Sequence, residues 1–175
     1  RLEESVVTTL RMLGMEDAQF VVEVAEREQY TPLGTDDVAY LFTANRTTKP
    51  AAVERIASGG ELSRIMLALK ALIAEKRMLP TVIFDEIDTG VSGRIADAMG
   101  DIIARMAETM QIVDITHLPQ VASKSGAHFV VYKEEGRSNI RRLAKAERVD
   151  EIAKMLSGSE ITEAARKQAR ILLSK

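Results

Sequence analysis

Hydrophobic and polar positions divide the first part of the chain into one helix and two strands. Leucine and valine recur at helical spacing over residues 2–13, and the pattern stops at Gly14, a residue typical of helix C-termini. Residues 18–25 and 38–42 are rich in β-branched and aromatic side chains, which predicts two strands. The segment between these strands holds residues typical of a turn: Pro32, Gly34, Asp36 and Asp37.

The middle of the chain alternates between helical and strand patterns. Apolar residues from Leu62 follow the helical period, and this helix is expected to end near Arg77. Residues 81–84 lack polar alternation, which is typical of a strand buried on both faces. A helical pattern over residues 95–106 then precedes a strand over residues 112–115, and this order predicts a parallel α/β core. The apolar face of the first helix is expected to comprise Ile65, Met66, Leu69, Leu72 and Ile73.

The last third of the chain predicts a short helix, an antiparallel strand pair and two final helices. The expected ranges are 119–124 for the short helix, 128–133 and 139–143 for strands joined through Gly136, and 148–156 and 160–173 for helices separated by Ser157, Gly158 and Ser159. The strand pair and the first two strands are expected to form an antiparallel flank. A chain of 175 residues has room for one well-buried domain, and neither an internal repeat nor an inter-domain linker is visible.

Composition narrows the classes of function. The chain is 46% hydrophobic and 29% charged, as soluble globular proteins are. It has no cysteine, which excludes disulfides and thiolate chemistry and suits a reducing cytoplasm, and its two histidines exclude a multi-histidine metal site. A net charge of −2 argues against a surface that coats nucleic acid. No apolar run approaches the ~20 residues of a membrane span.

Acidic residues follow the strand at residues 81–84. In a parallel sheet, ligands collect beyond the carboxyl ends of the strands, where Asp85 is suited to holding Mg²⁺ and Glu86 to polarising a water. Asp88 adds a third carboxylate. The structural alternative is a strand-to-loop transition with solvated acids.

A glycine pair precedes the first central helix. Ser58, Gly59, Gly60 and Glu61 predict a helix start whose unpaired N–H groups can hold an anion. The alternative is purely structural, because a serine with a glutamate three residues later forms a capping box. The two interpretations are compatible, since a capped helix N-terminus keeps its positive dipole.

The two histidines differ in position. His117 follows the strand at residues 112–115, where its ring could donate a hydrogen bond to a phosphate oxygen, although a lone histidine is more often structural. His128 lies in a predicted strand, and no function is assigned to it.

Together these stretches resemble a known family. Residues 57–64, with the sequence ASGGELSR, resemble the ABC-type signature motif. Residues 81–86 resemble a Walker B strand with its catalytic glutamate, and residues 115–120 resemble the switch-histidine loop. Combined with residues 84–93 and 151–158, the pattern is similar to the RecN family, bacterial DNA double-strand-break repair ATPases related to SMC proteins. The resemblance covers nearly the whole chain.

The resemblance implies an α/β fold, the C-terminal lobe of an ABC/SMC-type ATPase head with a mostly parallel central sheet flanked by helices. Residues 1–13 would be the end of a coiled-coil arm, and residues 14–175 the ATPase lobe. The sequence has no Gly-x-x-x-x-Gly-Lys-Ser/Thr phosphate loop, so the Walker A half is expected from an N-terminal lobe of the same polypeptide.

The resemblance also implies roles for individual residues. Asp85 would serve Mg²⁺, Glu86 would orient the attacking water, and His117 would sense the γ-phosphate. The loop at residues 88–92 would cross a dimer interface, although Ser92 stands where many members of the wider family have aspartate. The residues facing the ATP of the opposite protomer would be Ser58, Gly59 and Gly60, with Glu61 beside them.

The implied activity is ATP hydrolysis that drives head dimerisation and DNA engagement in repair and recombination of damaged DNA. The expected partners are the Walker A lobe, a second head and DNA, with no membrane, in the cytoplasm at the nucleoid. The isolated chain is expected to be inactive without Walker A. Two alternatives stay open: a non-catalytic docking module of an SMC-like complex, and a metal-dependent nuclease using Asp85, Glu86 and Asp88.

Overall fold

The computed structural model describes residues 1–32, 34–55, 58–158 and 160–174. These residues form two compact units, Arg1–Pro80 with Thr89–Val91, and Thr81–Asp88 with Ser92–Lys175. Each unit has a hydrophobic cluster of its own, and the division into an arm (residues 1–13) and a single lobe (residues 14–175) stays a prediction. Ala57 of the signature-like stretch and Ser159 of the break between the last helices lie outside the described residues.

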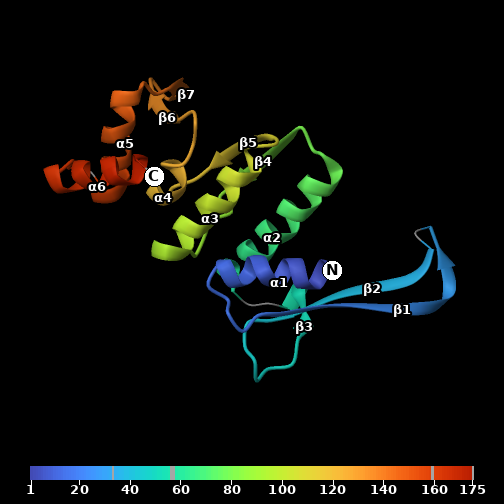
Figure 1. Cartoon of the computed structure of the whole chain (residues 1–175). Helices are drawn as coiled ribbons and strands as arrows, with labels where there is room; N and C mark the ends of the chain where they lie inside the picture. Colours follow the sequence, from blue (N-terminus) through green and yellow to red (C-terminus); the bar gives the residue numbers. More distant parts are fainter. Residues whose placement is uncertain (33, 56–57, 159, 175) are drawn as a thin grey trace. The chain divides into compact units, whose positions relative to one another are not determined.

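The first unit combines two long helices with an antiparallel sheet (Figure 1). The sheet has the strand order β1-β2-β3. The helices and strands of the first unit are α1 (Leu2–Met12), β1 (Gln19–Thr31), β2 (Gly34–Thr43), β3 (Ala51–Ala52), the 3-10 turn η1 (Val53–Arg55) and α2 (Gly59–Arg77).

Helix α1 ends at the predicted glycine. Gly14 has a φ of 79°, and its N–H donates to the carbonyl of Arg11 at 3.0 Å. The N–H of Met15 donates to the carbonyl of Leu10, also at 3.0 Å, which completes a Schellman motif. Leu10 and Met15 are both buried in the cluster of the first unit, so this end of the helix is stabilised by hydrogen bonds and by packing.

Strands β1 and β2 are longer than predicted. Asp36 and Asp37 were assigned to the turn, but they lie in β2 opposite Glu26 and Ala25. Asp37 accepts a hydrogen bond from Arg27 at 2.5 Å. Such cross-strand ion pairs stabilise a pair of strands whose side chains are exposed to solvent. The base of the ribbon is buried, whereas its outer part is solvent-exposed on both faces.

Helix α2 begins at Gly59, within the helix start predicted at residues 58–61. Its buried face contains Ile65 and Ala68, and the partly buried Leu69 and Leu72 pack against the same cluster. The predicted apolar face was wrong at two positions: Met66 is 38% exposed and Ile73 is 52% exposed. Neither belongs to this cluster, so the apolar stripe of the sequence is wider than the face that the cluster buries.

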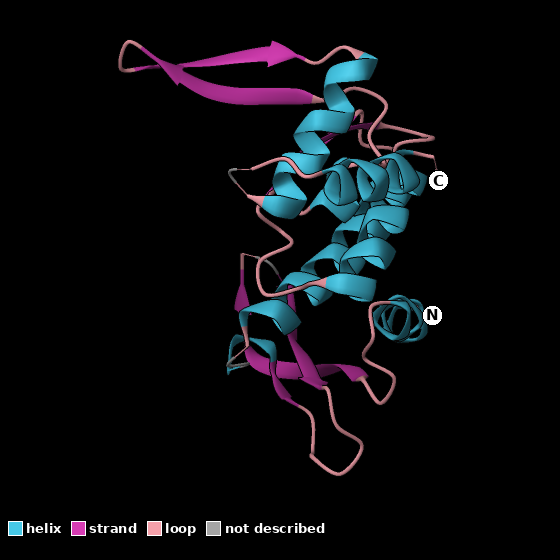
Figure 2. Cartoon of the chain, turned by 90° about the vertical axis from the view of Figure 1, so that its left-hand side faces the viewer, coloured by secondary structure: helices cyan, strands magenta, loops and turns pink. Residues whose placement is uncertain are grey.

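Over its described residues, the second unit contains a parallel strand pair, an antiparallel strand pair and four helices. Figure 2 shows the helices of the chain in cyan and the strands in magenta. The parallel pair β4–β5 confirms the predicted α/β class and the parallel centre, whereas the other described strand pairs are antiparallel. The elements are β4 (Thr81–Asp85), α3 (Gly93–Met106), β5 (Gln111–Ile115), α4 (Pro119–Ala122), β6 (Phe129–Glu134), β7 (Arg137–Arg142), α5 (Lys145–Ser157) and α6 (Glu163–Leu173).

One face of the β4–β5 pair is open. Phe84 is fully buried on one face, but Ile83 on the other is 61% exposed. Val113 pairs with Ile83 and is exposed on the same face, as is Ile115 opposite Asp85. The prediction that this strand is buried on both faces was therefore wrong in this structure, because a covering layer packs on one face only.

The C-terminal elements follow the predicted order. The β6–β7 hairpin turns through Glu135 and Gly136, both with positive φ, as a type I′ turn requires. Helices α5 and α6 bury a shared cluster that includes Ile152, Ala153 and Ala169. Among the helices of the described ranges, none combines the length and the hydropathy needed to cross a membrane.

Candidate functional site

The signature-like residues form the N-terminus of α2, as predicted. Ser58 is the N-cap, and its Oγ accepts a hydrogen bond from the N–H of Glu61 at 3.4 Å. Gly59 and Gly60 occupy the first two helical positions, where backbone N–H groups have no partner within the helix. The glycines therefore lie within the first turn of the helix, and the N–H groups of this turn carry its positive dipole.

Gly60 is needed for close packing inside the first unit. A Cβ on Gly60 would lie 3.0 Å from the carbonyl oxygen of Gly90, and a Cβ on Gly90 would lie 3.3 Å from the backbone of Gly60. Gly90 also has a φ of 77°, which disfavours other residues. The segment that follows Asp88 in the sequence is thus held against the start of α2 by two glycines.

Gly59 has different surroundings. Among the described residues, no atom outside its chain neighbours and the helix's own backbone lies within 4 Å of the position that its Cβ would occupy, and the residue is exposed. Packing within the first unit therefore does not require glycine at this position. An open backbone at a helix N-terminus suits the close approach of an anion.

Arg64 connects the two helices of the first unit. Its Nε donates to the carbonyl of Gly60 at 2.9 Å, and its Nη1 donates to the carbonyl of Leu13 at 3.1 Å. Leu13 is the C-cap of α1, so the guanidinium satisfies a carbonyl that the helix leaves open. The last residue of the signature-like stretch thus stabilises the fold.

In the second unit, Asp85 and Glu86 lie at the carboxyl end of β4. Asp85 is the last strand residue and is exposed. Glu86 is also exposed, has a φ of 49°, and its N–H donates to the carbonyl of Ile115 at 3.0 Å. A left-handed backbone is costly for a residue with a side chain and is often found at functional sites. The backbone hydrogen bond to β5 holds Glu86 in this conformation.

Asp88 connects the loop after β4 with the loop after β5. It is 1% exposed, and its Oδ2 accepts a short hydrogen bond from Thr116 Oγ1. The N–H of Leu118 donates to the same Thr116 Oγ1 at 2.9 Å. Asp88 Oδ1 lies 3.6 Å from Nδ1 of His117, whose side chain is 64% exposed.

Asp114 points a second carboxyl group into the same region. Partial burial, followed by the charge of Asp88, raises the pKa of Asp114 to about 6. Within the described part of the chain, Oδ1 of Asp114 and Oδ1 of Asp88 are both buried without a hydrogen-bond partner. Burying a carboxylate oxygen without a hydrogen-bond partner costs free energy, so Asp114 is expected to destabilise the fold when it is ionised.

The structure places the predicted site residues in two groups. Ser58, Gly59, Gly60 and Glu61 belong to the first unit, whereas Asp85, Glu86 and His117 belong to the second. Within the second unit, Asp88 and the Glu86–Ile115 hydrogen bond link the ends of β4 and β5. Sequence reasoning missed the Gly60–Gly90 contact and the Asp88–Asp114 pair. The signal for the second was an aspartate between two β-branched residues in a predicted core strand.

A multi-carboxylate metal site is not formed. Over the described ranges, no three histidine or acidic side chains are placed to hold a metal ion together. The structure therefore gives no support to the nuclease alternative, which needs Asp85, Glu86 and Asp88 as one cluster. Mg²⁺ commonly uses one or two protein carboxylates with water and phosphate oxygens, and Asp85 fits that pattern.

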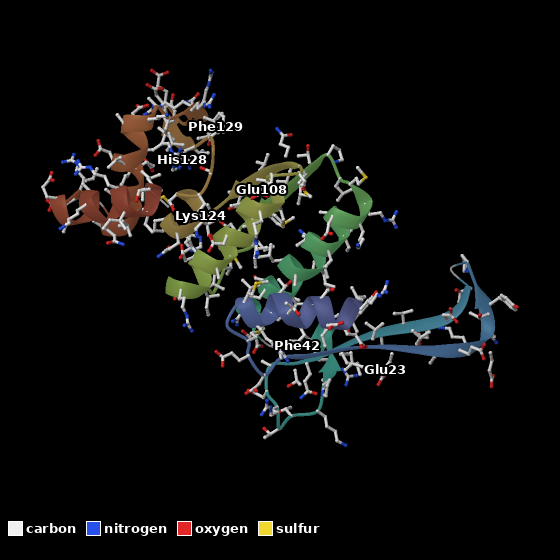
Figure 3. The ribbon with its side chains drawn as sticks, viewed as in Figure 1. Glu23, Phe42, Glu108, Lys124, His128 and Phe129 are labelled. Atoms are coloured by element: carbon white, nitrogen blue, oxygen red, sulfur yellow. The ribbon has the colours of Figure 1, made fainter. Side chains whose placement is uncertain are left out.

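Lys124 and His128 are two further titratable positions of the second unit (Figure 3). Lys124 binds Asp97 at 2.9 Å and also Asp101, which ties the end of α4 to α3. The pKa of His128 is lowered by burial and then by nearby Arg148, while Glu151 opposes the shift.

Comparison with known proteins gives one consistent result. No family model matches the sequence. The chain is 43% identical to "DNA repair protein RecN" of Rickettsia bellii over 177 residues, which cover 99% of this chain and 32% of that protein. RecN of Haemophilus influenzae is 38% identical and covers 99% of the chain, and RecN of Bacillus subtilis is 36% identical and covers all of it.

Solved structures agree at the level of the fold. The Smc head domain of Pyrococcus yayanosii, solved with a coiled coil and joint, has a TM-score of 0.71 at 16% identity and matches 89% of this chain and 29% of its own. A chain solved in work on ATP-driven dimerization and DNA-stimulated activation of SMC ATPases has a TM-score of 0.61 at 17% identity, covering 90% of this chain and 94% of that one. The fold is thus that of an SMC-type ATPase head lobe. The chain belongs to the RecN family and spans about a third of the length of the relatives it matches.

Proposed function

We propose that this chain is the C-terminal lobe of an ATP-hydrolysing DNA repair protein and contributes half of a composite ATP site formed when two heads meet. Its RecN relatives are named as DNA repair proteins, and SMC ATPase heads share its fold. In this proposal, Ser58, Gly59 and Gly60, with Glu61 beside them, face the ATP of the opposite head. Asp85, Glu86 and His117 act at the ATP of their own head.

The ends of β4 and β5 supply the hydrolytic groups. Asp85 offers an exposed carboxylate to Mg²⁺, and bound Mg²⁺ would neutralise charge on the phosphates. Glu86, one residue further, presents its carboxylate to solvent and can accept a proton from an attacking water. His117 lies at the end of the neighbouring strand, where its ring can donate to a phosphate oxygen.

The start of α2 supplies the phosphate contact for the opposite head. Ser58 caps the helix, and the free space around Gly59 allows a phosphate to approach the backbone N–H groups closely. Glu61 donates its backbone N–H to the Ser58 side chain, so its contribution is to the cap. Residues 1–13 would be the base of a coiled-coil arm, and residues 14–175 the lobe itself.

The proposed Walker A lobe needs a surface on which to pack. The open face of β4–β5 carries Ile83, Val113 and Ile115, which are exposed apolar side chains at the strands that lead to the site. An exposed apolar sheet face of this kind is typical of an interface. We infer that the N-terminal lobe of the same polypeptide covers it. A location at the nucleoid would follow from DNA repair.

The observation that carries the proposal is the strained backbone of Glu86, held by Ile115 directly after Asp85. The test is ATP turnover of this chain mixed with the Walker A lobe of the same protein. We expect no Mg²⁺-dependent turnover from the chain alone, turnover from the mixture, and loss of turnover in Glu86→Gln. Glu108→Gln removes an exposed acid of the same unit, on the turn after α3, and serves as the matched control. Full turnover in Glu86→Gln would remove Glu86 from its role.

A second candidate function is a docking module without catalysis. The open apolar face of β4–β5 favours it equally, because that face suits a partner whether or not ATP is present. Association between heads reconstituted from this chain and the Walker A lobe, measured by sedimentation with and without ATP, separates the two. Head–head association that needs ATP supports the composite site, whereas association independent of nucleotide supports docking alone.

A further inference from the structure

Asp88 occupies an unusual position for a loop residue. It lies three residues after Asp85, yet it is 1% exposed, while Asp85 and Glu86 face solvent. Burying a carboxylate is costly unless its oxygens interact with donors. The groups that meet this carboxylate therefore indicate what it does.

One carboxylate oxygen fixes the course of the next loop. Asp88 Oδ2 accepts from Thr116 Oγ1, and the same hydroxyl accepts from the N–H of Leu118 at 2.9 Å. The hydroxyl thus has both its proton and a lone pair committed. His117 lies between these two anchored residues, so its backbone is held on both sides.

The other oxygen faces the histidine ring. Asp88 Oδ1 lies 3.6 Å from Nδ1 of His117 and has no hydrogen-bond partner among the described residues. The ring itself is largely exposed, with 64% of the side chain accessible. The ring nitrogen near the protein is therefore Nδ1, and Nε2 is left for groups outside the unit.

We propose that Asp88 is a positioning residue that acts through His117. Its buried carboxylate attracts the proton of the ring to Nδ1 and thereby fixes the tautomer and the orientation of the imidazole. A carboxylate or carbonyl partner on one ring nitrogen commonly sets the state of the other. When the ring is doubly protonated, Nε2–H then points outward as a donor for a phosphate oxygen, with Asp88 as the counter-charge on the opposite side.

The role of Nε2 rests on the proposed function, but the tautomer does not. A purely structural Asp88, needed only for the Thr116 hydrogen bond, would leave the His117 tautomer at the preference of free imidazole, which favours the proton on Nε2. Asp88→Leu removes the carboxylate at nearly constant size. Thr116→Val removes the hydroxyl at nearly constant size and leaves the Asp88–His117 pair in place.

The test is the ring ¹⁵N spectrum of the histidine-labelled chain at about pH 8.5, about two units above the ordinary histidine pKa, so that a neutral ring reports its tautomer. We expect His117 to carry its proton on Nδ1 in the wild-type chain and in Thr116→Val, and mainly on Nε2 in Asp88→Leu. His128 provides an internal control because the chain has two histidines. An Nε2–H ring in the wild-type chain would overturn the proposal, even if a variant failed to fold. So would an unchanged Nδ1–H ring in Asp88→Leu. The ring spectrum does not depend on ATP turnover, so the result of this test is independent of the proposed function.

Discussion

Replacing Asp114 with asparagine is expected to stabilise the fold at neutral and alkaline pH. Asp114 lies in β5, its Oδ1 is buried without a hydrogen-bond partner among the described residues, and the charge of Asp88 opposes its ionisation. An asparagine of the same size removes the charge. Its amide group also offers a donor to the unpaired Asp88 Oδ1.

The size of the effect follows from the pKa of Asp114. Burial and Asp88 raise this pKa from 3.8 to about 6. Between these values the unfolded chain loses its proton before the folded chain does, so the free energy of unfolding falls as pH rises, and the loss is complete above about pH 6. A shift of about two units corresponds to ~3 kcal/mol, and solvent screening of this partly exposed group reduces it to about 1–2 kcal/mol.

Urea denaturation followed by circular dichroism tests this prediction. At pH 8, Asp114→Asn should raise the free energy of unfolding by about 1–2 kcal/mol. Near pH 4 the gain should largely disappear, since the carboxyl group is then neutral in the folded state and only about half ionised in the unfolded state. Glu108→Gln, on an exposed turn of the same unit, should show no comparable pH dependence (Figure 3). The reasoning is refuted if Asp114→Asn is less stable than the wild-type chain at pH 8, or equally stabilised at both pH values.

The two signature glycines, Arg64 and Glu86 give further predictions. Gly60→Ala should lower the free energy of unfolding by about 1–3 kcal/mol, because its Cβ meets the Gly90 carbonyl at 3.0 Å. Gly59→Ala should leave the free energy of unfolding unchanged or raise it by up to about 1 kcal/mol. The same substitution should lower the ATP turnover of the two-lobe mixture. Equal destabilisation by both would contradict the packing difference. Arg64→Met should cost about 2–4 kcal/mol in urea denaturation, because it removes hydrogen bonds to Gly60 and to the C-terminus of α1; a loss below 0.5 kcal/mol would contradict this. Glu86→Gly should raise stability by about 1 kcal/mol by relieving the left-handed backbone while abolishing turnover, and a destabilised Glu86→Gly would show that the conformation is not strained.

Local chemistry made much of the secondary structure predictable. Gly14 ends α1 through a Schellman motif that needs a positive φ, and Gly136 closes β6–β7 for a similar reason. Ser58 caps α2 as its side chain suggested. Such signals involve residues a few positions apart, so they can be read from the sequence.

Burial was less predictable, because it depends on what packs against each face. The run Thr81–Phe84 lacks polar alternation and suggested a strand covered on both sides, yet Ile83 is 61% exposed. Met66 and Ile73 fit a helical stripe equally well, yet both are exposed and neither belongs to the cluster of the first unit. Hydrophobic periodicity gives the period of an element, but it does not say how many layers surround it.

The sequence by itself determined which chemical groups stand at the carboxyl end of each central strand: Asp85 and Glu86 at the end of β4, and His117 after β5. It also determined the helix start with two glycines, because these features depend on residue type and order. Only the tertiary structure distinguished Gly60, pressed against Gly90, from the open Gly59. Only the structure placed Asp88 beside both Asp114 and His117. The physical reason is that the distances between these side chains depend on how β4 and β5 pair and how their loops fold back, and neither is encoded in the spacing along the chain.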